Sequence, residues 1–153
     1  MKLLLALALV FAVAFCAKPL SWTKCDSGAT FDVSQVTMTP YPAIAGKAVT
    51  VHAHGMENKT YSNGDWDTTV YLDGLPVKKF TGSICNPPII PDCPCPCPVG
   101  PHTTALTVEI PSFAITSDGY SGQFTAYDQD KHLILCIKYN FSIENKGVSA
   151  IEQ

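Results

Sequence analysis

Two groups of side chains in this sequence have the chemistry to bind a metal ion. His52 and His54 would share one face of a strand, a spacing that zinc sites use when another ligand comes from elsewhere. A Pro-rich loop carries four cysteines that could hold a soft metal, namely Cys85, Cys93, Cys95 and Cys97. The sequence offers no further ligand for the histidines, and cysteines this close form disulfides in an exported protein. We therefore expect a solvated histidine face, two loop disulfides, no metal and no cofactor.

The motifs in the sequence do not indicate catalysis. The sequence lacks the Gly-x-Ser-x-Gly nucleophile elbow, the His-Glu-x-x-His zinc-protease motif and a glycine-rich phosphate loop. Asp65 and Asp67 could form a carboxylate pair, but they follow Asn63-Gly64, and we interpret them as part of an acidic turn. We predict that the protein is not an enzyme.

The first residues predict export. Residues 1–17 have one early cation, Lys2, then an apolar run from Leu3 to Phe15 and small residues, which is the pattern of a cleaved signal peptide. The run is shorter than the roughly 20 residues of a membrane-spanning helix. Residues 18–153 are then expected to form a single domain. The chain contains no arginine and has a net charge of -3, which argues against nucleic-acid binding.

The remaining sequence predicts an all-β fold. Short alternating apolar runs are separated by Gly, Pro, Asn and Asp, without helical periodicity. About seven strands at this spacing are typical of an immunoglobulin-like antiparallel β-sandwich. Turns are expected at Asp73-Gly74 and at residues 128–131. The expected strands are residues 30–38, 47–54, 68–72, 77–80, 103–110, 122–127 and 133–144.

Alternation along the last expected strand separates its two faces. Leu135, Ile137 and Tyr139 share an apolar face, whereas Asn140 points the other way. An outward asparagine suits a glycosylation sequon, and Asn58 begins a second sequon in the chain. We expect sugars at both positions.

The cysteines outside the leader are even in number, which suits a disulfide framework. Cys25 lies at the start of the expected domain and Cys136 in its last strand, and we expect these two to pair. The four cysteines of the loop can then pair among themselves in any of three ways, and the residues alone do not choose among them.

Several short motifs, in this order and spacing, resemble the ML (lipid-recognition) domain family. That family includes the Niemann-Pick type C sterol carrier and phosphatidylglycerol/phosphatidylinositol transfer proteins. The resemblance covers essentially all of the chain after the leader. The motifs are Trp22-Thr23-Lys24-Cys25, residues 71–77, Cys85, Cys97-Pro98-Val99, and residues 127–131 running into Leu135-Cys136-Ile137.

The resemblance implies a sandwich whose sheets part to leave an apolar tunnel for one lipid. It also implies disulfides Cys25–Cys136 and Cys85–Cys97. The chain departs from the family in two places, because residues 39–46 lack a cysteine pair that many members carry and the loop has two additional cysteines. Pairing of Cys85 with Cys95 and of Cys93 with Cys97 is therefore also feasible.

The expected function is to bind a phospholipid in the tunnel and to transfer it between membranes. The lysine pair Lys78-Lys79 is expected to contact the head group or the membrane, and Phe80 and Ile84 are expected at the tunnel mouth, next to the cysteine loop. The remaining lining candidates are Val49, Val51, Val70, Leu72, Leu106, Val108, Phe124, Leu135, Ile137 and Tyr139. Alternatives are a sterol carrier and a secreted recognition module that presents lipid to a receptor. We expect a monomer with transient membrane contact, either secreted or in the lumen of the endo-lysosomal system.

Overall fold

The computed structural model describes residues 19–25, 28–86, 89–91 and 93–145, which form an all-β sandwich. The expected signal peptide, residues 1–17, lies outside the described residues. No helix in these ranges is long and apolar enough to cross a membrane.

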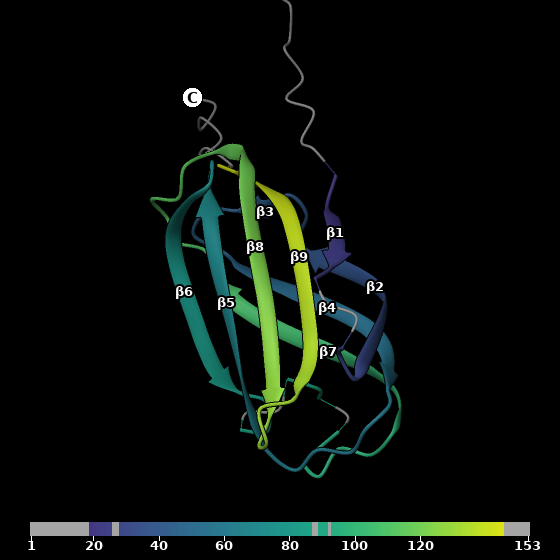
Figure 1. Cartoon of the computed structure of the whole chain (residues 1–153). Helices are drawn as coiled ribbons and strands as arrows, with labels where there is room; N and C mark the ends of the chain where they lie inside the picture. Colours follow the sequence, from purple (N-terminus) through teal and green to yellow (C-terminus); the bar gives the residue numbers. More distant parts are fainter. Residues whose placement is uncertain (1–18, 26–27, 87–88, 92, 146–153) are drawn as a thin grey trace, which may run out of the picture.

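Two sheets pack face to face, and their strands cross obliquely (Figure 1). The larger sheet has the strand order β1-β9-β8-β5-β6, and the short β3 pairs with β9 in parallel. Its strands are β1 (Ser21–Lys24), β3 (Ala43–Ile44), β5 (Gly64–Leu72), β6 (Leu75–Ser83), β8 (Ser117–Asp128) and β9 (Leu133–Glu144). The smaller sheet has the order β2-β4-β7 and consists of β2 (Phe31–Thr39), β4 (Ala48–Glu57) and β7 (Gly100–Glu109).

The structure confirms the predicted all-β sandwich, with nine strands in place of about seven. The two additional strands, β1 and β3, have four and two residues, too few for an alternating pattern to be recognised. The acidic turn predicted at Asp65 and Asp67 is wrong. Both residues belong to β5, because β8 and β6 on either side supply backbone partners as far back as Gly64 and Asp65.

Asp73 and Gly74 form the predicted two-residue turn between β5 and β6. Both have positive φ, 49° and 83°, as a type I′ hairpin turn requires. Such a turn matches the right-handed twist of the strands that it joins, and it sets the register of β6 against β5.

Asp128 organises the other predicted turn, between β8 and β9. The side chain of Asp128 is buried. Its Oδ1 accepts hydrogen bonds from the backbone N–H groups of Asp130 and His132, each 2.8 Å long. Its Oδ2 accepts a hydrogen bond from the side-chain ammonium of Lys59 at 3.1 Å. Burial alone would raise the pKa of this carboxyl. The hydrogen bonds from His132, Lys59 and Asp130 outweigh burial and lower the pKa from 3.8 to about 2.

Asp128→Asn is therefore expected to destabilise the fold by on the order of 2 kcal/mol at neutral pH. A lowered pKa stabilises the folded state above the ordinary value of 3.8, and this contribution is lost as the pH falls toward about 2. The difference between wild type and variant, measured by urea unfolding, should thus shrink in acid. Asp130→Asn, at an exposed neighbour, is the control and should change the free energy of unfolding by less than about 0.5 kcal/mol. Equal losses in both variants would contradict the role of Asp128.

The interior consists of two apolar clusters that meet near the middle of β8 and β9. Phe124 and Ile137 belong to the first cluster, which lies toward the cysteine loop. Tyr120 and Phe141 belong to the second, toward the opposite end of these strands. Tyr139 packs against both clusters and so marks their boundary.

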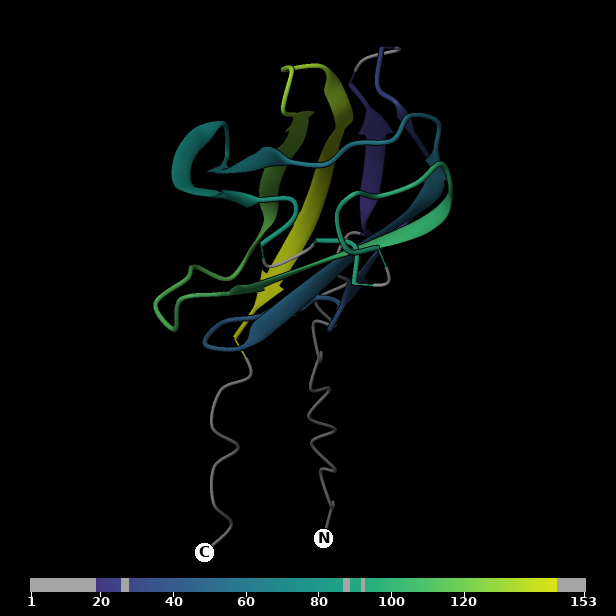
Figure 2. The same ribbon diagram turned by 90° about the horizontal axis from the view of Figure 1, so that it is seen from below.

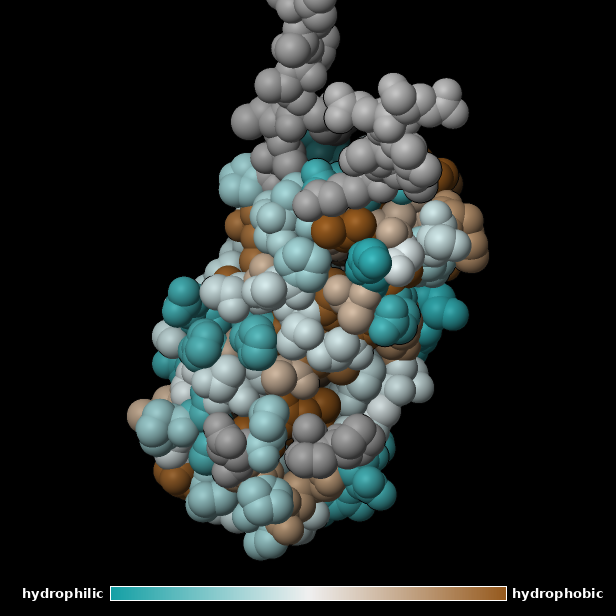
Figure 3. All heavy atoms as spheres, turned by 180° about the vertical axis from the view of Figure 1, so that it is seen from behind, coloured by the Kyte–Doolittle hydropathy of each residue, from teal (hydrophilic) through white to brown (hydrophobic). Residues whose placement is uncertain are grey.

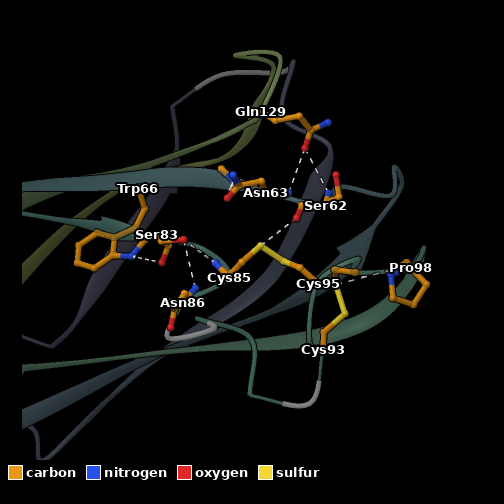
Figure 4. Close-up of a disulfide and its surroundings, with 12 residues drawn as sticks. Ser62, Asn63, Trp66, Ser83, Cys85, Asn86, Cys93, Cys95, Pro98 and Gln129 are labelled. Atoms are coloured by element: carbon orange, nitrogen blue, oxygen red, sulfur yellow. Dashed lines mark hydrogen bonds between the residues drawn. A yellow bond between two sulfur atoms is a disulfide. The ribbon is translucent and has the colours of Figure 1, made fainter.

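All six cysteines outside the leader are paired. Cys25 bonds to Cys136, as expected. In the loop, Cys85 bonds to Cys95 and Cys93 to Cys97 (Figure 4), so the Cys85–Cys97 pairing implied by the resemblance is wrong and the alternative connectivity is the one formed.

Backbone pairing accounts for this loop connectivity. Cys97 and Tyr61 exchange backbone hydrogen bonds, which holds the Cys97 side chain fully buried in the core. The backbone N–H of Cys93 donates to Ile90 O, and the Cys93 side chain is buried in the same cluster as Cys97. Cys85, two residues after the end of β6, stays half-buried and bonds to the half-buried Cys95.

Candidate functional site

A cavity of about 290 Å³ lies between the sheets, in the part of the sandwich formed by the second apolar cluster. Its lining includes none of the described residues of the cysteine loop. Aliphatic and aromatic side chains dominate this lining, including Met38, Val49, Val51, Val70, Leu72, Leu106, Val108, Tyr120, Phe141 and Ile143. The cavity can therefore hold an apolar group and offers few partners to water.

Strand alternation explains how the walls form. On β5, Val70 and Leu72 are two residues apart and point to the same face of the sheet, toward the cavity. On the facing sheet, Val51 of β4 pairs with Leu106 of β7. The cavity is thus a space that the two inner faces leave unfilled.

The inner end of the cavity contains a buried hydrogen bond between two hydroxyl groups. Tyr139 Oη of β9 and Thr68 Oγ1 of β5 lie 2.7 Å apart. Burial raises the pKa of Tyr139, and the hydrogen bond with Thr68 opposes this only in part, so the phenol stays neutral at physiological pH. The pair is polar but internally satisfied, which leaves the rest of the wall apolar.

Exposed apolar side chains mark the mouth of the cavity. Phe113, Ile115 and Val77 all line the cavity, although they are 86%, 63% and 51% exposed. Phe113 and Ile115 belong to the segment between β7 and β8, which projects from the side of the sandwich in Figures 1 and 2. On the face seen in Figure 3, in contrast, hydrophobic residues reach the surface in separate patches among hydrophilic ones. An apolar rim around an apolar cavity is typical of a site that takes up a hydrophobic ligand.

A family model of the ML domain matches residues 19–143. This chain belongs to the ML domain family. The ML domain thus occupies nearly all of the described residues.

Named relatives share this domain along most of their length. A Dictyostelium discoideum protein, provisionally named phosphatidylglycerol/phosphatidylinositol transfer protein 1, is 30% identical over 81% of this chain and 81% of its own. The phosphatidylglycerol/phosphatidylinositol transfer protein of Aspergillus oryzae is 27% identical over 84% of this chain and 73% of its own.

Two solved structures share the fold of this ML domain. A Niemann-Pick type C2 protein from the Japanese carpenter ant superposes with a TM-score of 0.63 at 14% identity, covering 81% of this chain and 99% of the other. Chicken MD-1, crystallised with lipid IVa, superposes with a TM-score of 0.55 at 11% identity, covering 79% of this chain and 86% of the other. At these identities the likeness establishes the fold alone.

The structure brings most of the predicted lining residues of the ML domain to one cavity. Those on the cavity wall are Val49, Val51, Val70, Leu72, Phe80, Leu106, Val108 and Tyr139. Phe124, Leu135 and Ile137 instead line a smaller pocket beyond Tyr139.

Ile84 is placed differently from the prediction of a mouth residue. It is 2% exposed and lies in the first apolar cluster. Its backbone N–H donates to Gly64 O, which draws the chain after β6 into the solid part of the core. The mouth therefore lies away from the cysteine loop, on the side of Phe113.

The two lysines of β6 point to different sides of the sheet. Lys78 lines the cavity, and its Nζ lies 5.7 Å from the centre of the Phe80 ring. Lys79 is exposed, and its Nζ lies 3.9 Å from Asp67 Oδ2. Alternation along the strand separates them, so only Lys78 lies beside the cavity.

The predicted histidine face does not gather metal ligands within the described residues. His54 Nδ1 lies 2.8 Å from Thr103 Oγ1, and neither His54 nor His52 belongs to a group of three possible ligands. One such group, Cys93, Cys97 and His102, has both of its thiols in a disulfide. Zinc binds thiolates, so this group does not fit the ion.

Both sequon asparagines lie at exposed positions of the ML domain. Asn140 Nδ2 donates to Ser21 Oγ at 3.2 Å, and Asn58 Nδ2 donates to Thr30 O at 2.9 Å. Attachment of sugar at either position remains a prediction.

The residues of the mouth were not predicted from the sequence. Phe113 and Ile115 follow a strand and lie in a segment without regular structure, where polar residues are usual. The apolar side chains Phe113, Ala114 and Ile115 in such a segment are the signal that could have identified them.

Proposed function

We propose that this ML domain binds a phospholipid in its cavity and carries it between membranes as a non-catalytic transfer protein. The observation that carries the proposal is the apolar cavity with its exposed apolar mouth at Val77, Phe113 and Ile115. The names of the relatives from Dictyostelium discoideum and Aspergillus oryzae support phosphatidylglycerol or phosphatidylinositol as the lipid.

Burial of acyl chains supplies the binding free energy. Each methylene that leaves water contributes about 0.8 kcal/mol. The wall of the cavity is apolar and its one buried hydroxyl pair, Tyr139 with Thr68, is already bonded, so a chain displaces no protein hydrogen bond there.

Lys78 is the proposed contact for the phosphate of the head group. Its ammonium lies at the mouth, where a phosphate would stay near water while the chains enter. Lysine binds phosphate as a point charge. Lys79 already lies near Asp67 on the outer face, so we do not assign it this role.

The proposed setting is outside the cytoplasm, either secreted or in the lumen of the endo-lysosomal system, with the protein acting as a monomer. The three disulfides fit an oxidising compartment.

Transfer of fluorescent lipids between vesicles tests the proposal. We expect the protein to accelerate transfer of phosphatidylglycerol or phosphatidylinositol, with a smaller effect on a sterol. Acceleration of the sterol alone would replace the phospholipid carrier by a sterol carrier. If the folded protein accelerates neither lipid, the carrier function is wrong.

Phe113→Asp is expected to weaken binding to vesicles roughly 10- to 100-fold, because burial of a phenylalanine contributes about 1.5–3 kcal/mol. The side chain is 86% exposed, so the fold should not change. Co-sedimentation with phosphatidylglycerol vesicles measures the loss.

Val99→Asp is the matched control, because Val99 is 58% exposed but does not line the cavity. It adds the same charge at a position away from the mouth and should bind vesicles nearly as wild type does. Equal weakening by both variants would contradict docking through the mouth.

A further inference from the structure

We propose that Tyr139 sets the length of acyl chain that the cavity accepts, by closing its inner end against a second apolar pocket. This inference rests on the proposed function, and it assigns the selectivity of the cavity for acyl-chain length to one residue.

The ring of Tyr139 lies across the inner face of the larger sheet. Tyr139 on β9 pairs with Gly122 on β8, and its hydroxyl reaches Thr68 on β5, so the side chain spans three neighbouring strands. Gly122 makes this possible, since a Cβ there would lie 2.4 Å from Tyr139 Cζ. The ring is therefore held in place at both ends.

A second pocket of about 30 Å³ lies on the far side of Tyr139. Its wall includes the apolar side chains of Phe124, Leu135, Ile137 and Ile89. Its threonine, Thr104, already accepts a hydrogen bond from Ala53 N at 3.1 Å. The pocket therefore offers an apolar surface that suits the end of a hydrocarbon chain.

The two spaces share three residues and are separated by them. Val51, Leu106 and Tyr139 line both the cavity and the inner pocket. Val51 and Leu106 come from the smaller sheet and pair with each other, so they face Tyr139 and complete the partition. A chain that enters from the mouth must end or bend at this partition.

Removal of the ring would join the spaces and allow a longer chain to stay extended. Each additional methylene buried in the joined space raises affinity roughly fourfold. The inner pocket has room for one or two such groups, so the preference for long over short chains should rise roughly 4- to 16-fold.

The test compares wild type with Tyr139→Leu in competition between phosphatidylglycerols that have the same head group and differ only in acyl-chain length. Both proteins are loaded from an equimolar mixture in vesicles, and native mass spectrometry gives the ratio of long to short lipid retained. We expect Tyr139→Leu to shift this ratio toward longer chains.

Tyr120→Leu is the matched control. Tyr120 is a buried tyrosine that lines the cavity but not the inner pocket, and its hydroxyl also makes one hydrogen bond, to Ile115 O. Its replacement enlarges the cavity without opening the partition, so the chain-length ratio should stay near that of wild type. An equal shift in this control would overturn the role of Tyr139.

Leu106→Ala opens the same partition from the opposite sheet and provides a second test if Tyr139→Leu does not fold. It should shift the ratio in the same direction. An unchanged ratio in the folded variants would overturn the inference while lipid binding stands. If wild type itself retains no lipid of any length, the proposed function fails, and the inference fails with it.

Discussion

Val70→Trp is expected to reduce lipid transfer roughly 100-fold while the protein stays folded. Val70 lies two residues before the end of β5, and its side chain forms part of the cavity wall. An indole ring here would take the space of several methylenes, each of which contributes about 0.8 kcal/mol to binding. The rate of phospholipid transfer between vesicles measures the loss, and circular dichroism measures the fold.

Ala126→Leu is the counterpart in the solid half of the sandwich. Ala126 is fully buried in the first apolar cluster and lines neither the cavity nor the inner pocket, so overpacking should cost about 1–3 kcal/mol. Val70→Trp should show a smaller loss of stability, because its side chain enters empty space. Wild-type transfer by folded Val70→Trp protein would show that the lipid does not occupy this cavity.

Loss of the Cys25–Cys136 disulfide is expected to have the largest effect on stability. The bond joins residues 111 positions apart, and closing a loop of this size contributes about 5 kcal/mol in the chain-entropy model. Cys25→Ala/Cys136→Ala should therefore lower the free energy of unfolding by about that amount, measured in urea under non-reducing conditions. Alanine avoids placing a hydroxyl at the buried Cys136.

Cys85→Ala/Cys95→Ala is the control for this prediction. These cysteines are only 10 positions apart and half-buried, so the same model assigns about 3 kcal/mol to their bond. A larger loss in the loop variant than in Cys25→Ala/Cys136→Ala would contradict the argument from loop length.

The alternation of apolar residues along the strands predicted which side chains point into the interior of the sandwich. Val49, Val51 and Val70 share the pattern of a half-buried strand, and each lines the cavity. The pattern did not distinguish Val70, which lines the larger cavity, from Phe124, which belongs to the more closely packed cluster beyond Tyr139. Both side chains point inward by the same alternation, and the difference lies in the distance to the facing sheet.

The role of the segment after β7 was not predictable from strand patterns. Phe113 and Ile115 lie outside the strands, so no alternation assigns them a side. Their place at the mouth depends on where β7 ends relative to β6 on the other sheet. The pairing of the loop cysteines was not predictable from strand patterns either. It depends on the backbone pairing of Tyr61 with Cys97, which joins segments far apart in the sequence.

The sequence by itself determined most of the longer sheet-forming segments, the hairpin turns and the bridge from Cys25 to Cys136, because each depends on local alternation, turn chemistry or cysteine count. Only the tertiary structure decided that one half of the sandwich is solid and the other hollow, with Tyr139 between them. A cavity is the space left between two sheets, and that space depends on how far apart the facing side chains lie, which no single strand encodes.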